Sequence, residues 1–393
     1  MVVALLLLLL QTPVPVTPGG GRRPGVHPPG TDSLSAELFD PLVLDGIRKG
    51  VYSGAALVIG TRDSILFAKG YGRFNRSPSS PAVRVDSTLW DLASLTKVVA
   101  TTPALMLLVE RGQVDLDAPV VRYVPEFNGR GTEAITVRHL LTHTSGLRGT
   151  LPLRQAADSA AALRMVLTTT PIAKPGAQML YSDLNAILLG EIVRRVSGEP
   201  LDVFVGREIY GPLGIGDQMI FRPPRRVERR IVPTGVWRGH PVAGVVNDPN
   251  AAKLGGVAGH AGLFATAMGL AHFAQWMLGE GSPQLRPETV RLFTKIAVPA
   301  RRGTSARTLG WEALPTGEEV SSAGTLLGPR TYGHTGWTGT SLWIDPDRGL
   351  FVLLLTNRAY AQAAGARGTF TALKRIRAGV ADAAARAADR LGR

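Results

Sequence analysis

Strand-like segments are concentrated near the two ends of this sequence, and mainly helical segments fill the long region between them. Near the N-terminus, the apolar runs 54–60 and 64–69 are joined across 61–63, which predicts a β-hairpin. Near the C-terminus, 340–345 and 350–356 flank a Pro-Asp-Arg-Gly turn and predict a second hairpin. We therefore expect one antiparallel sheet built from both ends of the chain, with a mainly helical subdomain inserted between them.

The predicted fold class is α/β of the α+β type, with helices flanking the sheet. The most apolar helical segment is 94–111, for which Gly112 is the stop signal and within which Pro103 should cause a bend. Apolar residues at helical spacing predict further helices at 184–196, 267–278 and 371–391.

The N-terminal segment is predicted to lie outside the folded domain. Residues 2–10 form an apolar run that is too short to span a bilayer but suits the core of a signal peptide. A charged residue ahead of this run and a clear cleavage site are both missing. We predict a signal peptide at 1–12, a Pro/Gly-rich linker at 13–32 and one catalytic domain over 33–393. Export to the periplasm or the extracellular space follows from this prediction, without a stable membrane span.

The composition excludes several kinds of chemistry and of partner. The chain contains no cysteine, which rules out disulfides, thiolate nucleophiles and Cys-based zinc sites. The formal charge is +14, and its densest cluster is the arginine-rich run 222–230. Prolines in this run and the lack of interleaved aromatic residues argue against nucleic acid as a partner. A solvated loop is the favoured interpretation, and a loop that faces an anion or a polymer is the alternative.

Ser94-Leu-Thr-Lys97 brings a serine and a lysine within one helical turn of each other. Serine is a weak nucleophile until another group takes its proton. An amine can do so when burial or a neighbouring cation holds its pKa below the ordinary value of about 10.4. The opposing interpretation is that Ser94 caps the helix while Lys97 extends to the surface.

Three short motifs follow one another along the chain: Ser94-x-x-Lys97, Tyr181-Ser182-Asp183 and His334-Thr335-Gly336. In order and spacing they resemble the serine β-lactamase and penicillin-binding-protein superfamily. The segments 140–147, 210–214, 255–264 and 332–339 are similar to the class C β-lactamase-like branch of that superfamily. The resemblance covers roughly 38–373.

The resemblance implies a role for each matching residue. Ser94 would attack a carbonyl and carry the acyl group, and Lys97 and Tyr181 would share the proton transfer, with the identity of the base left open. His334 stands where lysine is more common. The backbone N–H groups of Ser94 and Trp337 would form the oxyanion hole, while Thr335, Gly336 and Asp183 would line the substrate side. The resemblance implies no metal and no organic cofactor.

Two departures from the family pattern bear on substrate recognition. Asp183 replaces an asparagine, and an ionised carboxylate can only accept hydrogen bonds, which places recognition of amide-bearing substrates in doubt. His334 can be neutral near pH 7 where lysine would be charged, which weakens any clamp on a substrate carboxylate. His260, in a Gly-rich loop, either lines the site or braces the loop. For His139 and His143, four residues apart, a structural role in their turn is favoured over zinc binding.

The sequence therefore predicts a serine hydrolase that acts through a Ser94 acyl-enzyme on ester or amide carbonyls. Carboxylesterase, β-lactamase and D-alanyl-D-alanine peptidase activities remain open at this point, with a small-molecule or peptidoglycan-like substrate. The alternative from another class is a cell-envelope binding protein that keeps the fold but not the turnover.

Overall fold

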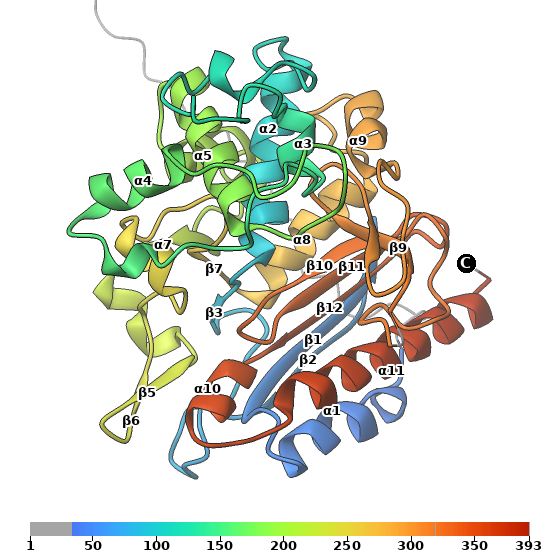
Figure 1. Ribbon diagram of the computed structural model, residues 1–393. Coiled ribbons are helices and arrows are strands. Elements are labelled where there is room, and N and C mark those ends of the chain that lie inside the picture. The colour runs from blue at the N-terminus through green and yellow to red at the C-terminus, as the bar shows by residue number, and fades with distance from the viewer. Residues whose placement is uncertain (1–33, 319, 393) are drawn as a thin grey trace, which may run out of the picture.

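The computed structural model describes residues 34–318 and 320–392 (Figure 1). The predicted signal peptide and linker lie outside these residues. One seven-stranded antiparallel sheet has the strand order β2-β1-β12-β11-β10-β9-β8. This sheet confirms the prediction that both ends of the chain contribute to one sheet. Its strands are β1 (Gly54–Thr61), β2 (Ile65–Gly72), β8 (Ser305–Arg307), β9 (Glu312–Thr316), β10 (Tyr332–Thr335), β11 (Ser341–Asp345) and β12 (Leu350–Thr356).

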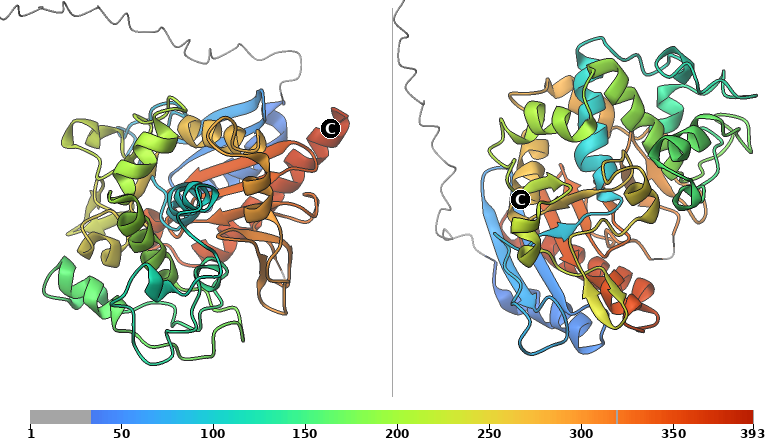
Figure 2. Two further views of the ribbon diagram at one scale, coloured as in Figure 1. Left: turned by 90° about the horizontal axis from the view of Figure 1, so that it is seen from above. Right: turned by 90° about the vertical axis from the view of Figure 1, so that its left-hand side faces the viewer.

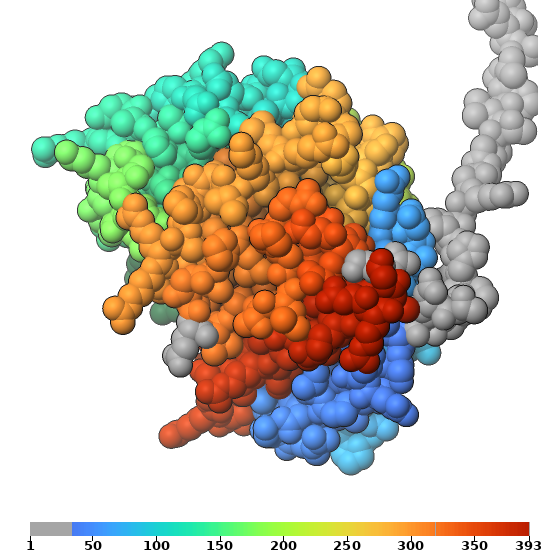
Figure 3. Space-filling view, turned by 90° about the vertical axis from the view of Figure 1, so that its right-hand side faces the viewer, coloured from blue at the N-terminus to red at the C-terminus, as the bar shows by residue number. Residues whose placement is uncertain are grey.

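The sheet is covered on both faces, which explains why its central strands are apolar throughout. In β1, Leu57 and Ile59 face one hydrophobic cluster while Ala56 and Val58 face another, because successive side chains of a strand point to opposite faces. Helices α1 (Asp40–Arg48) and α11 (Thr369–Arg390) cover the first face. Figure 3 shows the end of α11 on the surface between the blue N-terminal part and the orange segment.

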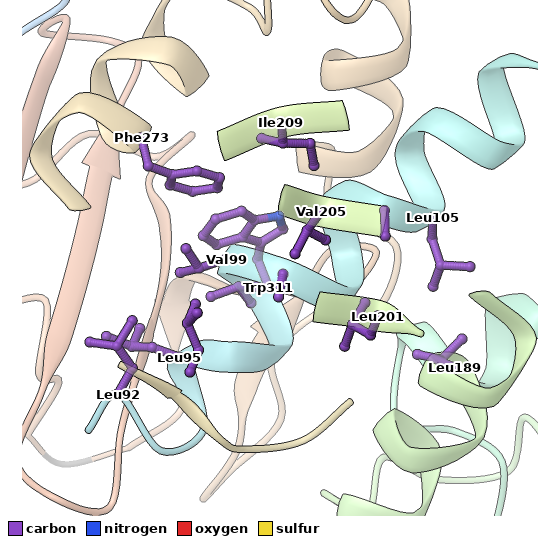
Figure 4. Packing of buried hydrophobic residues seen from close by; sticks show 14 of the residues in the cluster. Leu92, Leu95, Val99, Leu105, Leu189, Leu201, Val205, Ile209, Phe273 and Trp311 are labelled. Atoms are coloured by element: carbon purple, nitrogen blue, oxygen red, sulfur yellow. The ribbon is translucent and has the colours of Figure 1, made fainter. Parts of the chain in front are cut away.

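The helical region covers the other face, with α2 (Thr102–Glu110) at its centre (Figure 2). The helices around α2 include α5 (Asp183–Ser197), α6 (Leu201–Val205) and α8 (Ala267–Leu278), and α5 ends at Gly198 as predicted, with φ +76°. Apolar side chains from these elements surround the N-terminal part of the α2 segment (Figure 4). This packing holds the segment that bears the candidate amine, Lys97.

The predicted helix 94–111 differs from the structure in its first half. Residues Lys97–Thr101 form a π-helical segment (η2), and α2 begins only at Thr102. Pro103 has no N–H and cannot donate to the carbonyl four residues earlier. The N–H of Thr102 instead bonds to the carbonyl of Lys97, five residues earlier, so the proline is accommodated in the first turn of α2.

The remaining elements are short helices and two small sheets. The helices are α3 (Val137–Leu141), α4 (Ser159–Leu167), α7 (Pro249–Lys253), α9 (Pro287–Thr294) and α10 (Arg358–Ala363). A small sheet joins β3 (Trp90–Asp91), β7 (Leu263–Ala265) and β4 (Met219–Phe221), and β5 (Gly235–Trp237) pairs with β6 (His240–Val242).

Two further expectations concern charge and membranes. The run 222–230 was expected to be a loop, but it contains a short 3₁₀ helix, Arg225–Arg230, because its two prolines precede the helical turn instead of interrupting it. Arg225, Arg226 and Arg229 are exposed on it, as both a solvated segment and one that faces an anion would require. Within the part of the chain that the structure describes, no helix has the length and apolar character needed to cross a bilayer.

Candidate active site

The candidate nucleophile Ser94 lies in a turn between β3 and the π-helical segment. The carboxylate of Asp91 accepts hydrogen bonds from the N–H of Ala93 (2.8 Å) and of Asn247 (2.6 Å), and Ala93 adopts a left-handed φ of +47°. Burial raises the pKa of the Asp91 carboxyl to about 6, although these N–H donors oppose the shift. Asp91 therefore holds the backbone bend that presents Ser94.

Lys97 points into the site and does not extend to the surface, so the interpretation as a surface lysine is wrong. It is 3% exposed, and its Nζ donates to Ser94 Oγ (3.0 Å), Asp183 Oδ1 (2.8 Å) and the carbonyl of His260 (3.3 Å). Burial alone would disfavour the ammonium form. The phenolic group of Tyr181 and the carboxylate of Asp183, both beside Nζ, outweigh burial and hold the pKa of Lys97 above its ordinary value. Lys97 is thus an ammonium in the resting site.

Tyr181 faces this lysine and packs between two histidine rings. Lys97 Nζ lies 4.9 Å from the centre of the tyrosine ring, and the ring centres of His143 and His334 lie 4.6 Å and 5.8 Å away. His143 braces the segment, since its Nδ1 accepts from Ser182 N–H (3.2 Å) and its carbonyl accepts from Leu180 N–H (2.8 Å). The turn predicted to be structural therefore positions the Tyr181-Ser182-Asp183 motif.

His139 has a different contact from His143. Its Nδ1 accepts from the N–H of Thr136 (3.2 Å), which closes a capping box at the start of α3. Each of the two histidines thus makes its own structural contact.

His334 lies on β10, and one of its ring nitrogens has no hydrogen-bond partner among the described residues. Its Nδ1 donates to the carbonyl of Thr335 (2.8 Å), so the lone pair is on Nε2, which is buried and has no partner among the described residues. Burial, together with the charges of Arg307 and Lys97, holds the pKa of His334 well below its ordinary value. His334 is therefore a neutral hydrogen-bond acceptor where a lysine would be a cation.

Asp183, Asp248 and His260 form a polar cluster beside the lysine. His260 Nε2 contacts Asp248 Oδ1 (3.1 Å). Burial would raise the pKa of Asp248, but this contact and the backbone N–H groups of Asn250 and Ala251 together lower it to about 2. One potential ligand atom from each of the three residues lies within 4.8 Å of the others, a spacing that could hold a metal ion. Among these three residues, Asp183 already forms an ion pair with the Lys97 ammonium. His260 thus lies at the site through its carbonyl and braces the loop of Asp248 through its ring.

Two backbone N–H groups remain free beside the nucleophile. Neither the N–H of Ser94 nor that of Trp337 donates a hydrogen bond to any described residue. The loop 336–340 docks on the backbone that leads to Ser94: Thr338 Oγ1 donates to the carbonyl of Asp91 (2.6 Å) and Thr340 Oγ1 to that of Leu92 (3.0 Å). These contacts bring the two predicted oxyanion donors to the same side of the cleft.

Gly336 permits this docking because it has no side chain. A Cβ at this position would lie 2.4 Å from the carbonyl oxygen of Leu92 and 2.1 Å from Thr340 Oγ1. Both distances are shorter than any real Cβ contact, so only glycine allows the loop to approach the nucleophile segment.

Arg307, at the end of β8, is a site residue that the sequence motifs did not indicate. Its guanidinium carbon lies 5.5 Å from the centre of the Tyr181 ring, and the residue is 7% exposed. Its Nε and Nη1 are buried without a hydrogen-bond partner, and no described carboxylate lies within ion-pair distance. Arg307 belongs to no motif, so only the three-dimensional arrangement shows that it adds an uncompensated positive charge beside Tyr181.

Ser94 Oγ accepts a hydrogen bond from the buried Lys97 ammonium, and two free N–H groups lie beside it. A serine in this arrangement can form and release an acyl-enzyme. This is the chemistry of the serine hydrolases. The chain belongs to the Beta-lactamase family, whose model matches residues 39–375. It is a β-lactamase-family serine hydrolase, and the relatives of this family carry different activities in their names.

Individual relatives illustrate this range. A protein of Escherichia coli strain K12, provisionally named a D-alanyl-D-alanine carboxypeptidase, is 31% identical over 353 residues, which cover 80% of each chain. Among solved structures, EstCE1, described as a hydrolase with promiscuous acyltransferase activity, has a TM-score of 0.71 at 22% identity, covering 88% of this chain and 98% of its own. A class C β-lactamase has a TM-score of 0.68 at 20% identity, covering 88% and 96%. The structures support the predicted fold.

Replacing the nucleophile tests the assignment of the site. We expect Ser94→Ala to lower turnover by roughly 10⁴-fold or more, the scale of loss seen when a serine nucleophile is removed. Labelling by a serine-directed phosphonate, followed by intact mass, should disappear, while the circular dichroism melting curve stays that of the parent. Label that persists, or that maps to Ser145, would contradict the assignment.

The ion pair between Lys97 and Asp183 makes a prediction about pH. Because the carboxylate raises the pKa of Lys97, Asp183→Asn removes that support and lets burial lower the pKa. We expect the limb of the rate–pH profile that reports Lys97 to move to lower pH. Asp248→Asn is the matched control, since that carboxylate contacts His260. An unchanged profile in Asp183→Asn would show that Lys97 does not titrate in the reaction.

Proposed function

We propose that this protein hydrolyses short-chain carboxylic esters through an acyl-enzyme on Ser94. The observation that carries the proposal is the neutral His334, whose unpartnered Nε2 offers a lone pair in the position where a cation would hold a substrate carboxylate. A lone pair repels a carboxylate, and an unpaired buried charge costs several kcal/mol. An uncharged ester carries no such penalty.

Trp337 supports the same preference. Its side chain is 56% exposed at the residue that supplies the second oxyanion donor, so an indole borders the space next to the reacting carbonyl. An aromatic wall favours apolar groups. It carries no positive charge with which to hold an anionic β-lactam.

The proposed reaction begins with the ester carbonyl oxygen accepting hydrogen bonds from the N–H groups of Ser94 and Trp337. An ammonium has no lone pair, so Lys97 in its resting form cannot accept the serine proton. In this proposal Tyr181 first releases its own phenolic proton to solvent and then takes the proton of Ser94, while Lys97 and Arg307 lie beside its ring. Ser94 Oγ forms the bond to the carbonyl carbon, and the alcohol leaves with the proton from Tyr181. Water then attacks the acyl-enzyme by the reverse proton path and releases the acid.

A second candidate function is D-alanyl-D-alanine carboxypeptidase activity, and Arg307 favours it. A buried guanidinium without a carboxylate partner is costly, and the C-terminal carboxylate of a peptide would relieve that cost. The Escherichia coli relative carries this activity in its provisional name. A peptidoglycan-like substrate would also fit the proposed export of the chain.

Esterase and β-lactamase activities predict different ratios of kcat/KM between an ester and a cephalosporin. We expect kcat/KM for a short-chain nitrophenyl ester to exceed that for a chromogenic cephalosporin by at least about tenfold, a gap of ~1.4 kcal/mol. Trp337→Ser should narrow the gap, because it removes the indole wall. Trp237→Ser, which changes another exposed tryptophan on the β5–β6 hairpin, should leave it unchanged. Comparable or faster opening of the cephalosporin by the parent protein would make β-lactamase the better description.

A substitution at Arg307 distinguishes the peptidase function from the esterase function. If the peptidase is the true function, the parent protein releases D-alanine from a D-Ala-D-Ala peptide, and Arg307→Gln lowers that rate far more than it lowers ester hydrolysis. Under the esterase proposal, we expect little D-alanine release from the parent protein. Intact mass after exposure to the ester, the peptide and a penicillin shows which acyl group remains on the chain.

A further inference from the structure

Four of the five carbonyl groups of the loop 336–340 accept hydrogen bonds from residues of β12, α10 and α11. These bonds run from Arg358 to Trp337, from the N–H of Ala359 to Thr338 (3.0 Å), from Thr356 Oγ1 to Gly339 (2.9 Å) and from Arg377 Nη2 to Thr340 (2.7 Å). The hydroxyl groups of the same loop reach the nucleophile segment instead. The loop is therefore a bridge between the C-terminal helices and Ser94.

Arg358 makes the most extensive of these contacts. It is 1% exposed, its Nε (3.2 Å) and Nη2 both donate to the carbonyl of Trp337, and its Nη1 donates to Gln362 and to Thr369 Oγ1 (3.4 Å). Its guanidinium carbon also lies 4.7 Å from the ring centre of Trp337 and 5.7 Å from that of Phe370. One side chain thus fixes both the backbone and the indole of Trp337.

This anchoring determines where the N–H of Trp337 points. The peptide that contains this N–H has the carbonyl of Gly336, which accepts from the N–H of Gly339 (3.1 Å) inside the turn. In a planar trans peptide the N–H points opposite to the carbonyl, so it is directed out of the turn. Arg358 fixes the following peptide through the Trp337 carbonyl. The two peptide planes that flank the Trp337 Cα are therefore both fixed, the first by the N–H of Gly339 and the second by Arg358.

Arg358 and Arg377 also bring two buried positive charges close to the loop. Arg377 is 5% exposed, and burial together with the charge of Arg358 lowers its pKa to about 9. No described carboxylate lies within ion-pair distance of either arginine. Burying two such cations near each other is unfavourable for folding alone. Their charge would be offset when a negative charge develops on the carbonyl oxygen at the neighbouring oxyanion hole.

We propose that Arg358 is a positioning residue for the oxyanion hole: it sets the orientation of the Trp337 N–H and, with Arg377, favours the negatively charged tetrahedral intermediate. This inference rests on the proposed acyl transfer at Ser94, whatever the natural substrate. Arg358 itself does not contact the reacting atoms. Its contribution should appear in the acylation step and not in substrate binding.

The test compares Arg358→Ala and Arg358→Lys with the parent protein and with Arg375→Ala, an exposed arginine of α11. Single-turnover stopped flow with a nitrophenyl ester separates the acylation rate constant from the substrate dissociation constant. We expect Arg358→Ala to slow acylation by about 10²–10³-fold, the range for loss of an oxyanion contact, with a nearly unchanged dissociation constant. Arg358→Lys should recover part of the rate, because an ammonium can still donate to the Trp337 carbonyl.

Two further measurements separate positioning from a loss of folding. Added guanidinium ion, at concentrations far below those that unfold the protein, should raise the acylation rate of Arg358→Ala in a saturable way and leave Arg375→Ala unaffected. If Arg358 variants do not fold, Gln362→Ala is the substitute, since it removes one partner of the guanidinium and should lower the rate in the same direction. Parent protein that acylates no ester would overturn the proposed function, whereas folded variants that acylate at the parent rate would overturn the role of Arg358.

Discussion

The antiparallel pairing of β1 with β12 is the interaction on which the rest of this structure depends. It aligns Ala55 with Thr356 and Thr61 with Leu350, and so joins segments separated by about three quarters of the chain. The side chain of Asn357 extends the pairing, because its Oδ1 accepts from the N–H groups of Ser53 and Gly54 (3.1 Å each). Closing so long a loop has an entropic cost that the buried faces of both strands must offset.

This pairing determines the geometry of the site. The nucleophile segment follows the first hairpin, while the loop that bears Trp337 connects β10 to β11, directly beside β12. Neither half contains a complete oxyanion hole. The site is assembled only when the sheet is closed and the loop 336–340 bonds to the backbone of Asp91 and Leu92. Catalytic geometry and folding of the whole domain are thus linked through the same few hydrogen bonds.

Much of the fold follows from periodicity, and the sequence motifs indicated most of the candidate site. Both hairpins and the helices α5 and α8 formed where apolar spacing predicted them, because their buried faces follow from local pattern alone. The π-helical turn before Pro103 could not be predicted, since it depends on how the chain accommodates one missing N–H. Arg307, Arg358 and Arg377 were also missed. A buried arginine and an exposed one look alike in sequence, and only tertiary packing distinguishes them.

Gly336 and Trp337 have opposite consequences for how this site can vary. At 336 the backbone of the loop touches that of the nucleophile segment, so there is room for a hydrogen atom only. At 337 the side chain extends to solvent while its backbone is anchored from the other side. Changes in substrate range are therefore accessible at 337 without displacing Ser94. Gly336 is therefore constrained by the reaction geometry, whereas the side chain at 337 can change with the substrate.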